Sequence, residues 1–324
     1  MRVLIITGGT SSERKISFMS AGQVKEGLEE AGHKVKLFDL KKGFKELKKI
    51  IKEFDVIFPV IHGEEGEGGE LQKFLEKSGK PFVGGDWRGY KKGWFKIPFK
   101  KWCQENSIPT SKWKLISTKE DIIKFGFPCV LKSSSGGSSK EVVILKSKKD
   151  LGGYKIKKLL NSNLKLFVEH FIKGVEVTVA ILHNKALPVL EIIPPEGGWF
   201  DYKNKYWGNT KEIPHAPSLD GKTRQQAQKI ALKIHQTLNL GPYSRIDFIV
   251  ASHIGSSPRS AGGAGGNTVP YVLEVNTIPG LTASSLFPKA AQAAGLSFSN
   301  MLSELINLSA FINSSPALAG LPPG

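Results

Sequence analysis

Short apolar runs alternate with amphipathic stretches along the first hundred residues of the chain. The apolar runs predict the strands Val3–Thr7, Lys34–Asp39, Val56–Ile61 and Pro81–Val83. The stretches between them predict the helices Ser11–Ala31, Phe44–Lys52, Gly69–Ser78 and Gly89–Asn106. Strands that alternate with helices indicate a parallel sheet covered on both faces, so we expect an N-terminal α/β domain over residues 1–95.

Two further units follow in the pattern. Residues 96–183 predict a small domain, with strands Pro128–Lys132, Val142–Leu145, Leu166–His170 and Val175–Leu182 and the helix Asp150–Leu160. Residues 184–312 predict a third domain, with the helix Thr223–Leu238, strands Tyr243–Val250 and Val269–Val275, and helices between Phe287 and Phe311. The Gly/Ser-rich segment Ser252–Asn267 is expected to be an elongated hairpin loop, and residues 313–324 a flexible tail.

Composition excludes several classes of protein. Among 324 residues, 40% are hydrophobic and 23% charged, which is typical of globular domains and not of disordered or fibrous chains. No apolar run approaches the roughly 18 residues of a membrane-spanning helix, so we expect no membrane partner. Cys103 and Cys129 are the only cysteines and form no pair motif. A disulfide framework is therefore not expected, and a cytoplasmic location is.

The net charge of +17 is concentrated in one half of the chain. Residues 1–160 contain 33 basic and 19 acidic residues. The lysines are dispersed along predicted helices, so we interpret them as a solvated basic surface and expect no nucleic-acid partner.

Oxygen-bearing side chains gather on two predicted strands of the third domain. Arg245 and Asp247 share one strand face, and Glu274 and Asn276 share a face at the end of the next strand. Carboxylate and amide oxygens suit Mg²⁺ or Mn²⁺ held against nucleotide phosphates. A salt bridge of Arg245 with one carboxylate is the alternative.

Four other features have both a functional and a structural interpretation. The Ser/Gly segment 133–141 follows a strand that ends in Lys132 and could wrap phosphate, or be a surface hairpin. Glu13, at a helix start, could bind a substrate ammonium group or only stabilise the helix through its favourable interaction with the helix dipole. His62, at a strand end, could be a functional-site residue or a loop residue whose hydrogen bonds are satisfied within the fold. The long loop Trp199–Pro217, with Lys205 and Tyr206, could be a lid or a packed aromatic loop.

Taken in order, these motifs resemble the D-alanine–D-alanine ligase family of the ATP-grasp superfamily, over residues 2–312. The matching segments are Gly8-Gly9-Thr10-Ser11-Ser12-Glu13-Arg14, His62-Gly63-x-x-Gly66-Glu67, Gly136-Gly137-Ser138-Ser139, Val168-Glu169, Gly174-x-Glu176-x-Thr178-Val179, Asp201-Tyr202-x-x-Lys205-Tyr206, Ser244-Arg245-Ile246-Asp247, Leu273-Glu274-x-Asn276-Thr277-x-Pro279-Gly280 and Ser284-Ser285-Leu286-x-Pro288. The resemblance implies a three-unit ATP-grasp fold: an N-terminal Rossmann-like parallel-sheet domain, a small central ATP-grasp domain and a C-terminal α+β domain.

The resemblance also implies a nucleotide site between the second and third domains. Lys96 and Lys132 would hold ATP phosphates, and Lys205 is assigned to the same nucleotide. Glu169 would accept from the adenine amino group and Glu176 from the ribose, while backbone at Phe171 and Ile172 reads the base edge. Two Mg²⁺ (or Mn²⁺) ions would be held by Asp247, Glu274 and Asn276.

The implied reaction joins two D-alanines through an acyl phosphate. Arg245 and the N–H of Gly280 would stabilise the tetrahedral oxyanion. The first substrate's ammonium would bind Glu13, which forms a lid-closing triad with Ser138 and Tyr206. The second D-alanine would bind at Ser285 and Leu286, and His62 belongs to the same substrate site.

Three positions depart from the family pattern. Gly68 replaces an aspartate, Trp94-Phe95 precede Lys96 where Met-Asp is usual, and Lys140-Glu141 replace small or apolar residues. The alternatives are a related ligase that uses D-lactate and an ATP-binding module without ligase turnover. The resemblance further implies a homodimer.

Overall fold

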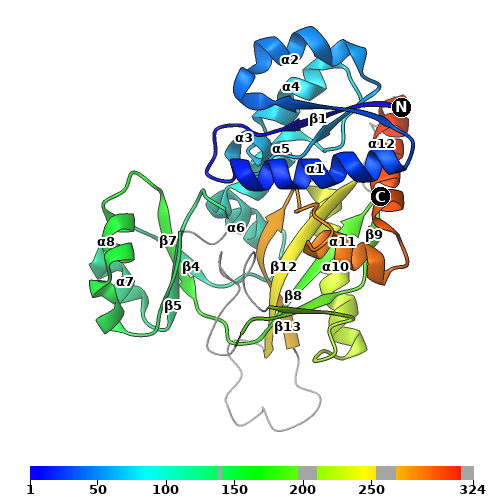
Figure 1. Cartoon of the computed structure of the whole chain (residues 1–324). Helices are drawn as coiled ribbons and strands as arrows, with labels where there is room; N and C mark the ends of the chain where they lie inside the picture. Colours follow the sequence, from blue (N-terminus) through cyan, green and yellow to red (C-terminus); the bar gives the residue numbers. More distant parts are fainter. Residues whose placement is uncertain (138–140, 196–209, 253–267, 315–324) are drawn as a thin grey trace.

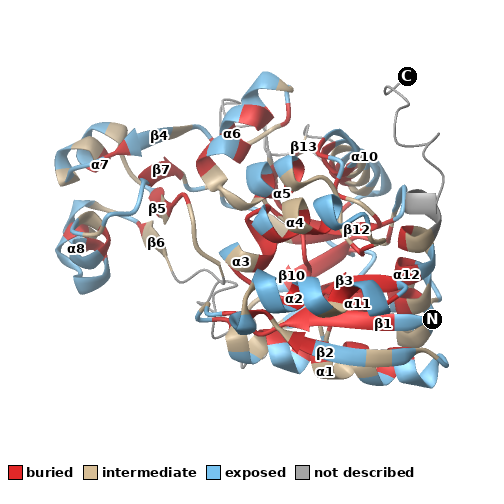
Figure 2. Cartoon of the chain, turned by 90° about the horizontal axis from the view of Figure 1, so that it is seen from above, coloured by how far each residue is buried: buried red, intermediate tan, exposed pale blue. Residues whose placement is uncertain are grey.

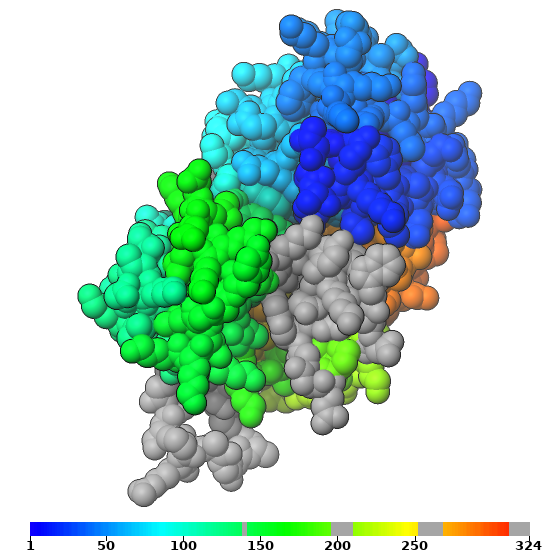
Figure 3. Space-filling model, turned by 60° about the vertical axis from the view of Figure 1, so that its left-hand side comes forward, coloured from blue at the N-terminus to red at the C-terminus, as the bar shows by residue number. Residues whose placement is uncertain are grey.

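The computed structural model describes residues 1–137, 141–195, 210–252 and 268–314, and in the last helix it describes side chains as far as Ala310. Three sheets organise this part of the chain. A three-stranded sheet lies in the N-terminal unit, a four-stranded sheet in the central unit and a six-stranded sheet in the C-terminal unit. Figure 1 shows the central unit standing out as a separate lobe, and Figure 3 shows it beside the N-terminal unit.

The N-terminal sheet is parallel, with order β2-β1-β3, as the alternating pattern predicts. Its strands are β1 (Arg2–Thr7), β2 (Lys34–Asp39) and β3 (Val56–Pro59), and its helices are α1 (Arg14–Glu30), α2 (Phe44–Ile50), α3 (Glu64–Glu67), α4 (Glu70–Ser78) and α5 (Trp87–Trp94). Val3 and Ile5 pack towards α1, whereas Leu4 and Ile6 pack towards α2 and α4. Because β1 is buried on both faces, its sequence is continuously apolar. The expected strand at Pro81–Val83 is only an isolated bridge between Ile57 and Phe82.

The helix expected over Gly89–Asn106 is two helices, α5 and α6 (Lys96–Glu105). Phe95, which separates them, has an extended conformation with ψ 109°. Pro98 accounts for the break, because it has no N–H to donate and its ring would clash with the carbonyl of Trp94 in a continuous helix. The break makes Lys96 the first residue of a new helix, where its backbone N–H donates to Ser134 O at 2.7 Å.

The central sheet is antiparallel, with order β4-β7-β5-β6. Its strands are β4 (Trp113–Ile116), β5 (Cys129–Ser133), β6 (Val142–Leu145) and β7 (Leu166–His170), with α7 (Lys119–Phe125) and α8 (Tyr154–Leu160) packed on one face. The helix α7 begins with a capping box between Thr118 and Asp121. The two helices leave the opposite face of the sheet turned towards the rest of the molecule (Figure 1).

The large sheet has the order β11-β10-β8-β12-β13, with β9 paired to β8. Its strands are β8 (Val175–Leu182), β9 (Lys185–Ala186), β10 (Leu190–Ile193), β11 (Lys211–Pro214), β12 (Tyr243–Ser252) and β13 (Thr268–Asn276). The helix α10 (Gly221–Thr237) packs on this sheet, and α11 (Leu286–Ala293) packs against β8 and β11. The helix α12 (Phe298–Ser314) packs against α11, α1 and β3, and so joins this unit to the N-terminal unit. In Figure 1, α12 lies beside α1, and Figure 2 shows the strands buried beneath their helices.

One strand assignment from the sequence is wrong. The pattern places Val175–Leu182 in the small central domain, but β8 pairs with β10 and β12 in the large sheet. Gly174 permits this crossing, because a Cβ there would lie 2.2 Å from Val250 O. Val177, Val179 and Ile181 pack on one face of β8 and Ala180 and Leu182 on the other, as suits a strand in the middle of a sheet. The domain boundaries themselves remain a prediction.

Other expected segments differ in smaller ways. Within the described residues, no helix is both long and apolar enough to span a bilayer. The predicted tail begins at residue 313, but α12 continues to Ser314. Residues 253–267 of the predicted hairpin loop and residues 315–324 of the tail lie outside the described residues.

Candidate functional site

Two cavities adjoin where the three units meet. The larger, of about 490 Å³, lies between the central sheet and the large sheet, and the smaller, of about 270 Å³, lies between the large sheet and the N-terminal unit. Both are lined by the same four residues, Lys96, Gly136, Gly137 and Glu274, which therefore form a shared wall. A group bound in one cavity can approach a group bound in the other across this wall.

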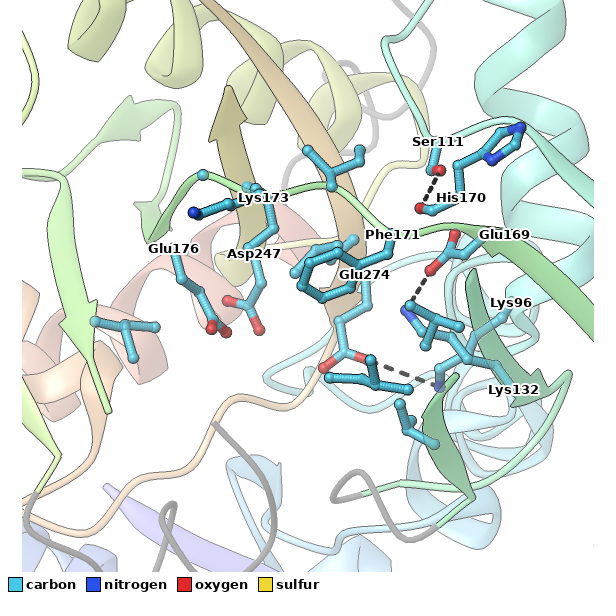
Figure 4. Close-up of a pocket in the computed structure, with 18 of the residues that line it drawn as sticks. Lys96, Ser111, Lys132, Glu169, His170, Phe171, Lys173, Glu176, Asp247 and Glu274 are labelled. Atoms are coloured by element: carbon cyan, nitrogen blue, oxygen red, sulfur yellow. Dashed lines mark hydrogen bonds and ion pairs between the residues drawn. The ribbon is translucent and has the colours of Figure 1, made fainter. Parts of the chain in front are cut away.

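Strands β12 and β13 bring together the three residues predicted to hold cations, with Arg245 beside them. Asp247 lies opposite Glu274 and Arg245 opposite Asn276 in the antiparallel register. Asp247 accepts from Arg245 Nε and Nη2, both at 2.9 Å, from Thr178 Oγ1 at 2.6 Å and from Asn276 Nδ2 at 3.0 Å. The predicted salt bridge and the predicted oxygen cluster therefore coexist in one site. Figure 4 shows the Asp247 and Glu274 side chains in the larger cavity, with Glu176 beside Asp247.

Lys132 and Glu169 form part of a buried charged group on the central sheet. Glu169 Oε1 lies 2.5 Å from Lys132 Nζ, and Glu169 Oε2 lies 2.5 Å from Lys100 Nζ on α6. Burial alone would raise the pKa of the Glu169 carboxyl, but the two lysines outweigh burial and lower that pKa to about 2. Glu169 is therefore ionised, and both its oxygens already have cationic partners. Glu169 also lines the larger cavity, and its assignment to an adenine stays a prediction.

Lys96 connects the helix α6 to the shared wall. Its Nζ donates to Gly136 O at 3.0 Å and lies 3.6 Å from Glu274 Oε2. Gly136 has φ +109°, a conformation that favours glycine. The backbone turn at Gly136 and the start of α6 thus place one lysine between the two cavities.

The link between β7 and β8 lines the opposite side of the larger cavity. Phe171 and Ile172 lie in this link, and Glu176 lies near the start of β8. The backbone oxygen of His170 accepts a hydrogen bond from Ser111 Oγ at 2.7 Å (Figure 4). Ser111 lies just before β4, so this bond fixes the link to the β4 edge of the central sheet. Apolar side chains and the exposed ring of Phe171 suit a flat aromatic group such as a base.

The smaller cavity collects the residues predicted for the amino-acid substrate. Glu13, His62, Arg245, Gly280, Ser285 and Leu286 all line it. Glu13 directly precedes α1, and Ser285 directly precedes α11, so two helix N-termini border the cavity. Ser285 Oγ lies 2.7 Å from Thr282 Oγ1 and accepts from Thr282 N–H at 3.2 Å. The cavity thus offers a carboxylate at one end and hydroxyl groups at the other.

Glu13 is in close contact with Gly137 in the Ser/Gly segment 133–141. A Cβ on Gly137 would lie 2.8 Å from Glu13 Oε2, so only a glycine leaves this carboxylate its present position. The N–H of Glu13 donates to Ser11 Oγ at 3.2 Å, and Ser11 Oγ donates to His62 O at 2.9 Å. These bonds join the two N-terminal motifs that the sequence singled out.

His62 and Glu67 are buried beside the same cavity. Burial lowers the pKa of His62, with Arg245 acting in the same direction and Glu13 against it, so the imidazole is neutral near pH 7. Burial raises the pKa of Glu67 to about 8, aided by the charge of Glu13 and opposed by backbone hydrogen bonds from Gly63 and Ile278. Glu67 is therefore protonated at neutral pH. Its hydrogen bonds connect Gly63, next to His62, with Ile278 in the loop after β13.

Three of the predicted residues, Ser138, Lys205 and Tyr206, lie outside the described residues, so the predicted lid triad stays a prediction. Three contributors were not predicted as site residues: Lys100, Thr178 and Glu67. Lys100 lies one helical turn after Lys96, and this spacing is the signal that could have found it. Thr178 and Glu67 stand within matched motifs, without any sign of their buried hydrogen bonds.

Comparison with known proteins gives consistent matches over nearly the whole chain. The family models described as D-ala D-ala ligase C-terminus and N-terminus match residues 95–307 and 43–85. The D-alanine–D-alanine ligase of Oleidesulfovibrio alaskensis is 35% identical over 312 residues, covering 95% of this chain and 96% of that protein. The Aquifex aeolicus ligase is 36% identical, covering 94% of this chain and 100% of that protein.

Solved structures agree with these relatives. A Bacillus anthracis D-alanine–D-alanine ligase complexed with ATP superposes with TM-score 0.79 at 28% identity, covering 97% of this chain and 99% of that one. The VanG D-Ala:D-Ser ligase of Enterococcus faecalis gives 0.74 at 27% identity, covering 95% and 99%. The fold and its cavity between two antiparallel sheets are those of an ATP-grasp ligase. Within that class, the chain belongs to the D-alanine–D-alanine ligase family.

Proposed function

We propose that this protein joins two D-alanine molecules into D-alanyl-D-alanine, with conversion of ATP to ADP and phosphate, to supply peptidoglycan precursor synthesis. The observation that carries the proposal is the shared wall of Lys96, Gly136, Gly137 and Glu274 between the two cavities. One cavity has lysines, carboxylates and apolar residues suited to a nucleotide. The other has Glu13 and Arg245, suited to an amino acid.

In this proposal the larger cavity holds ATP. Lys96 and Lys132 bind phosphate oxygens, Phe171 and Ile172 contact the base, and Glu176 accepts from the ribose. The apolar lining and the two lysines support this assignment, because a nucleotide needs a flat apolar slot at one end and positive charge at the other. Glu169, which lines the same cavity, accepts from the adenine amino group, and Lys205 remains a family-based assignment.

The oxygen-bearing residues fit a divalent cation beside those phosphates. Asp247 and Glu274 both line the larger cavity and are opposite each other in register, and Asn276 contributes an amide beside them. Hard oxygen donors of this kind suit Mg²⁺ or Mn²⁺. Asp247, Glu274 and Asn276 would hold two such ions, which neutralise phosphate charge when bound.

The smaller cavity then supports bond formation. Glu13 binds the ammonium group of the first D-alanine, whose carboxylate oxygen takes the γ-phosphoryl group to give an acyl phosphate and ADP. The amine of the second D-alanine, held at Ser285 and Leu286 with His62 nearby, attacks the acyl carbon and phosphate leaves. Arg245, held in one orientation by Asp247, and the N–H of Gly280 stabilise the oxyanion formed in that attack. Ser138 and Tyr206 complete the closure that excludes water from the acyl phosphate.

The direct test is incubation with ATP, Mg²⁺ and D-alanine, followed by mass detection of the dipeptide and assay of released phosphate. We expect one phosphate per dipeptide and no phosphate release without D-alanine. Nucleotide binding without D-alanine-dependent phosphate release would instead identify an ATP-binding module.

A second candidate is a ligase with a different second substrate. The VanG D-Ala:D-Ser ligase of Enterococcus faecalis has a fold similar to this chain, so the fold alone does not select D-alanine. Parallel reactions with D-alanine plus D-serine or D-lactate distinguish these products by mass.

The family resemblance also leads us to propose a homodimer and a cytoplasmic location. Light scattering coupled to size exclusion tests the first, with a mass near twice 35.4 kDa expected for the dimer. Cell fractionation tests the second.

A further inference from the structure

Lys100 is a buried charged residue to which the proposed reaction gives no role. It lies on α6, is 2% exposed, and is absent from the described lining of both cavities. Its Nζ lies 2.5 Å from Glu169 Oε2 and donates to Thr110 Oγ1 at 2.7 Å. A nucleotide in the larger cavity is therefore contacted by Lys132 and Glu169 but not by Lys100.

Glu169 is held by lysines on both sides. Lys132 contacts Oε1 and lines the larger cavity, whereas Lys100 contacts Oε2 from helix α6 and does not line that cavity. Two cations and one anion leave this buried group with one positive charge in excess. An anion arriving in the cavity is attracted to that excess and meets Lys132 first.

We propose that Lys100 is a positioning residue that holds Glu169 so that Lys132 can turn from Glu169 to the phosphates of ATP. The inference rests on the proposed use of ATP. A carboxylate as buried as Glu169, which is 3% exposed, cannot be left without a cationic partner except at a cost of several kcal/mol. While Lys100 stays in place, Lys132 can leave. Without Lys100, each departure of Lys132 strands a buried charge, so nucleotide binding is opposed.

Lys100 is itself firmly placed. Thr110, which accepts its hydrogen bond, donates in turn to Val272 O at 3.3 Å, and Pro109 O accepts from Val272 N–H at 2.8 Å. Val272 lies on β13, two residues before Glu274. Lys100 is thus anchored to the strand that carries a predicted cation ligand, while Lys132 belongs to the opposite wall of the cavity.

The test compares the ATP affinity of a single variant, a double variant and a control. The variants are Lys100→Met, Lys100→Met/Glu169→Gln and a control, Lys101→Met, at the exposed neighbouring lysine. ATP binding is measured by calorimetry without D-alanine, KM values are measured for ATP and D-alanine, and thermal unfolding verifies the fold. The glutamine keeps an oxygen that can accept from adenine.

We expect Lys100→Met to weaken ATP binding about tenfold, the ratio that corresponds to 1.4 kcal/mol. The KM for D-alanine should stay within about twofold, and Lys101→Met should match the wild type. In the double variant the neutral amide that replaces the Glu169 carboxylate no longer retains Lys132, so we expect most of the ATP affinity to return. A purely structural role for Lys100 predicts the opposite, because a second core change would add to the first.

Wild-type ATP affinity in Lys100→Met, or a double variant no better than the single one, would overturn the inference. If Lys100→Met does not fold, the double variant is compared with the wild type directly. ATP affinity within about threefold then supports the inference, and a tenfold loss contradicts it. Failure of the wild type to bind ATP would overturn the proposed function and this inference with it.

Discussion

Asp247 and Glu274 are register partners on neighbouring strands, yet their surroundings differ. The Asp247 side chain is 6% exposed and accepts from Arg245, Thr178 and Asn276. The Glu274 side chain is 30% exposed, with Lys96 Nζ at 3.6 Å. One carboxylate is thus part of the core, and the other lies on the wall between the cavities. Replacing them should have different consequences for stability.

We predict that Glu274→Gln and Asp247→Asn each nearly abolish dipeptide formation, because an amide is a weaker ligand than a carboxylate for a hard cation. Only Asp247→Asn should also lower the melting temperature, since it leaves the buried Arg245 without its anion, at a cost of about 3 kcal/mol. Steady-state kinetics at saturating Mg²⁺ and thermal unfolding measure both effects. The exposed Glu304→Gln is the control. Near wild-type turnover by either variant would remove that residue from the cation site.

Glu67 should make the stability of the protein depend on pH. Burial raises its pKa in the folded protein from 4.5 to about 8, so its contribution is fully present below about pH 4.5 and is lost as the pH rises through 8. The wild type should therefore lose up to a few kcal/mol of unfolding free energy between pH 5 and 9. Glu67→Gln should show a flatter dependence in urea unfolding.

Glu64→Gln is the matched control for this measurement, because Glu64 is exposed on the same short helix α3. It should keep the wild-type pH dependence. Equal slopes in the wild type and Glu67→Gln would show that Glu67 is ionised in the fold.

Gly137→Ala should impair binding of the first D-alanine. The added Cβ would lie 2.8 Å from Glu13 Oε2, so the carboxylate must move, although the flexible end of a side chain can do so without unfolding. We expect a loss of about tenfold in kcat/KM for D-alanine, with ATP affinity much less changed. Gly152→Ala, where a Cβ meets nothing within 4 Å, should behave as the wild type. Unchanged D-alanine kinetics in Gly137→Ala would contradict the role of Glu13.

Tyr206 is predicted from the family resemblance to select an amine as the second substrate. A histidine at this position could carry positive charge near neutral pH and would favour an anionic hydroxy acid. In competition at pH 7, the wild type should form almost only the dipeptide from D-alanine and D-lactate, and Tyr206→His should shift towards the ester. An unchanged product ratio would exclude Tyr206 as the selective element.

In this chain the sequence predicts which segments form strands and helices better than it predicts which strands pair with each other. Val3–Thr7 is predicted as a strand because its apolar run has the length of one. The position of β8 was missed, since pairing with β10 and β12 is set by residues far along the chain. The break between α5 and α6 was missed although Pro98 signals it, because a proline in a first helical turn and one within a helix look alike in a short window.

The candidate site shows the same division. Arg245, Asp247, Glu274 and Asn276 were predicted together because a two-residue spacing fixes the face of a strand. Lys100 was interpreted with the surface lysines, since nothing local distinguishes a lysine that meets Glu169 in the core from one in water. The buried partner decides its character, and the partner lies 69 residues away.

The wall of Lys96, Gly136, Gly137 and Glu274 has a consequence for inhibitor chemistry. Because both cavities share these residues, a single molecule could place a phosphate mimic on one side and an amino-acid mimic on the other. Once one half is bound, the other half is presented to its cavity at an effective concentration in the millimolar range. Two weak fragments, each with little affinity alone, would then combine into a tight bisubstrate ligand.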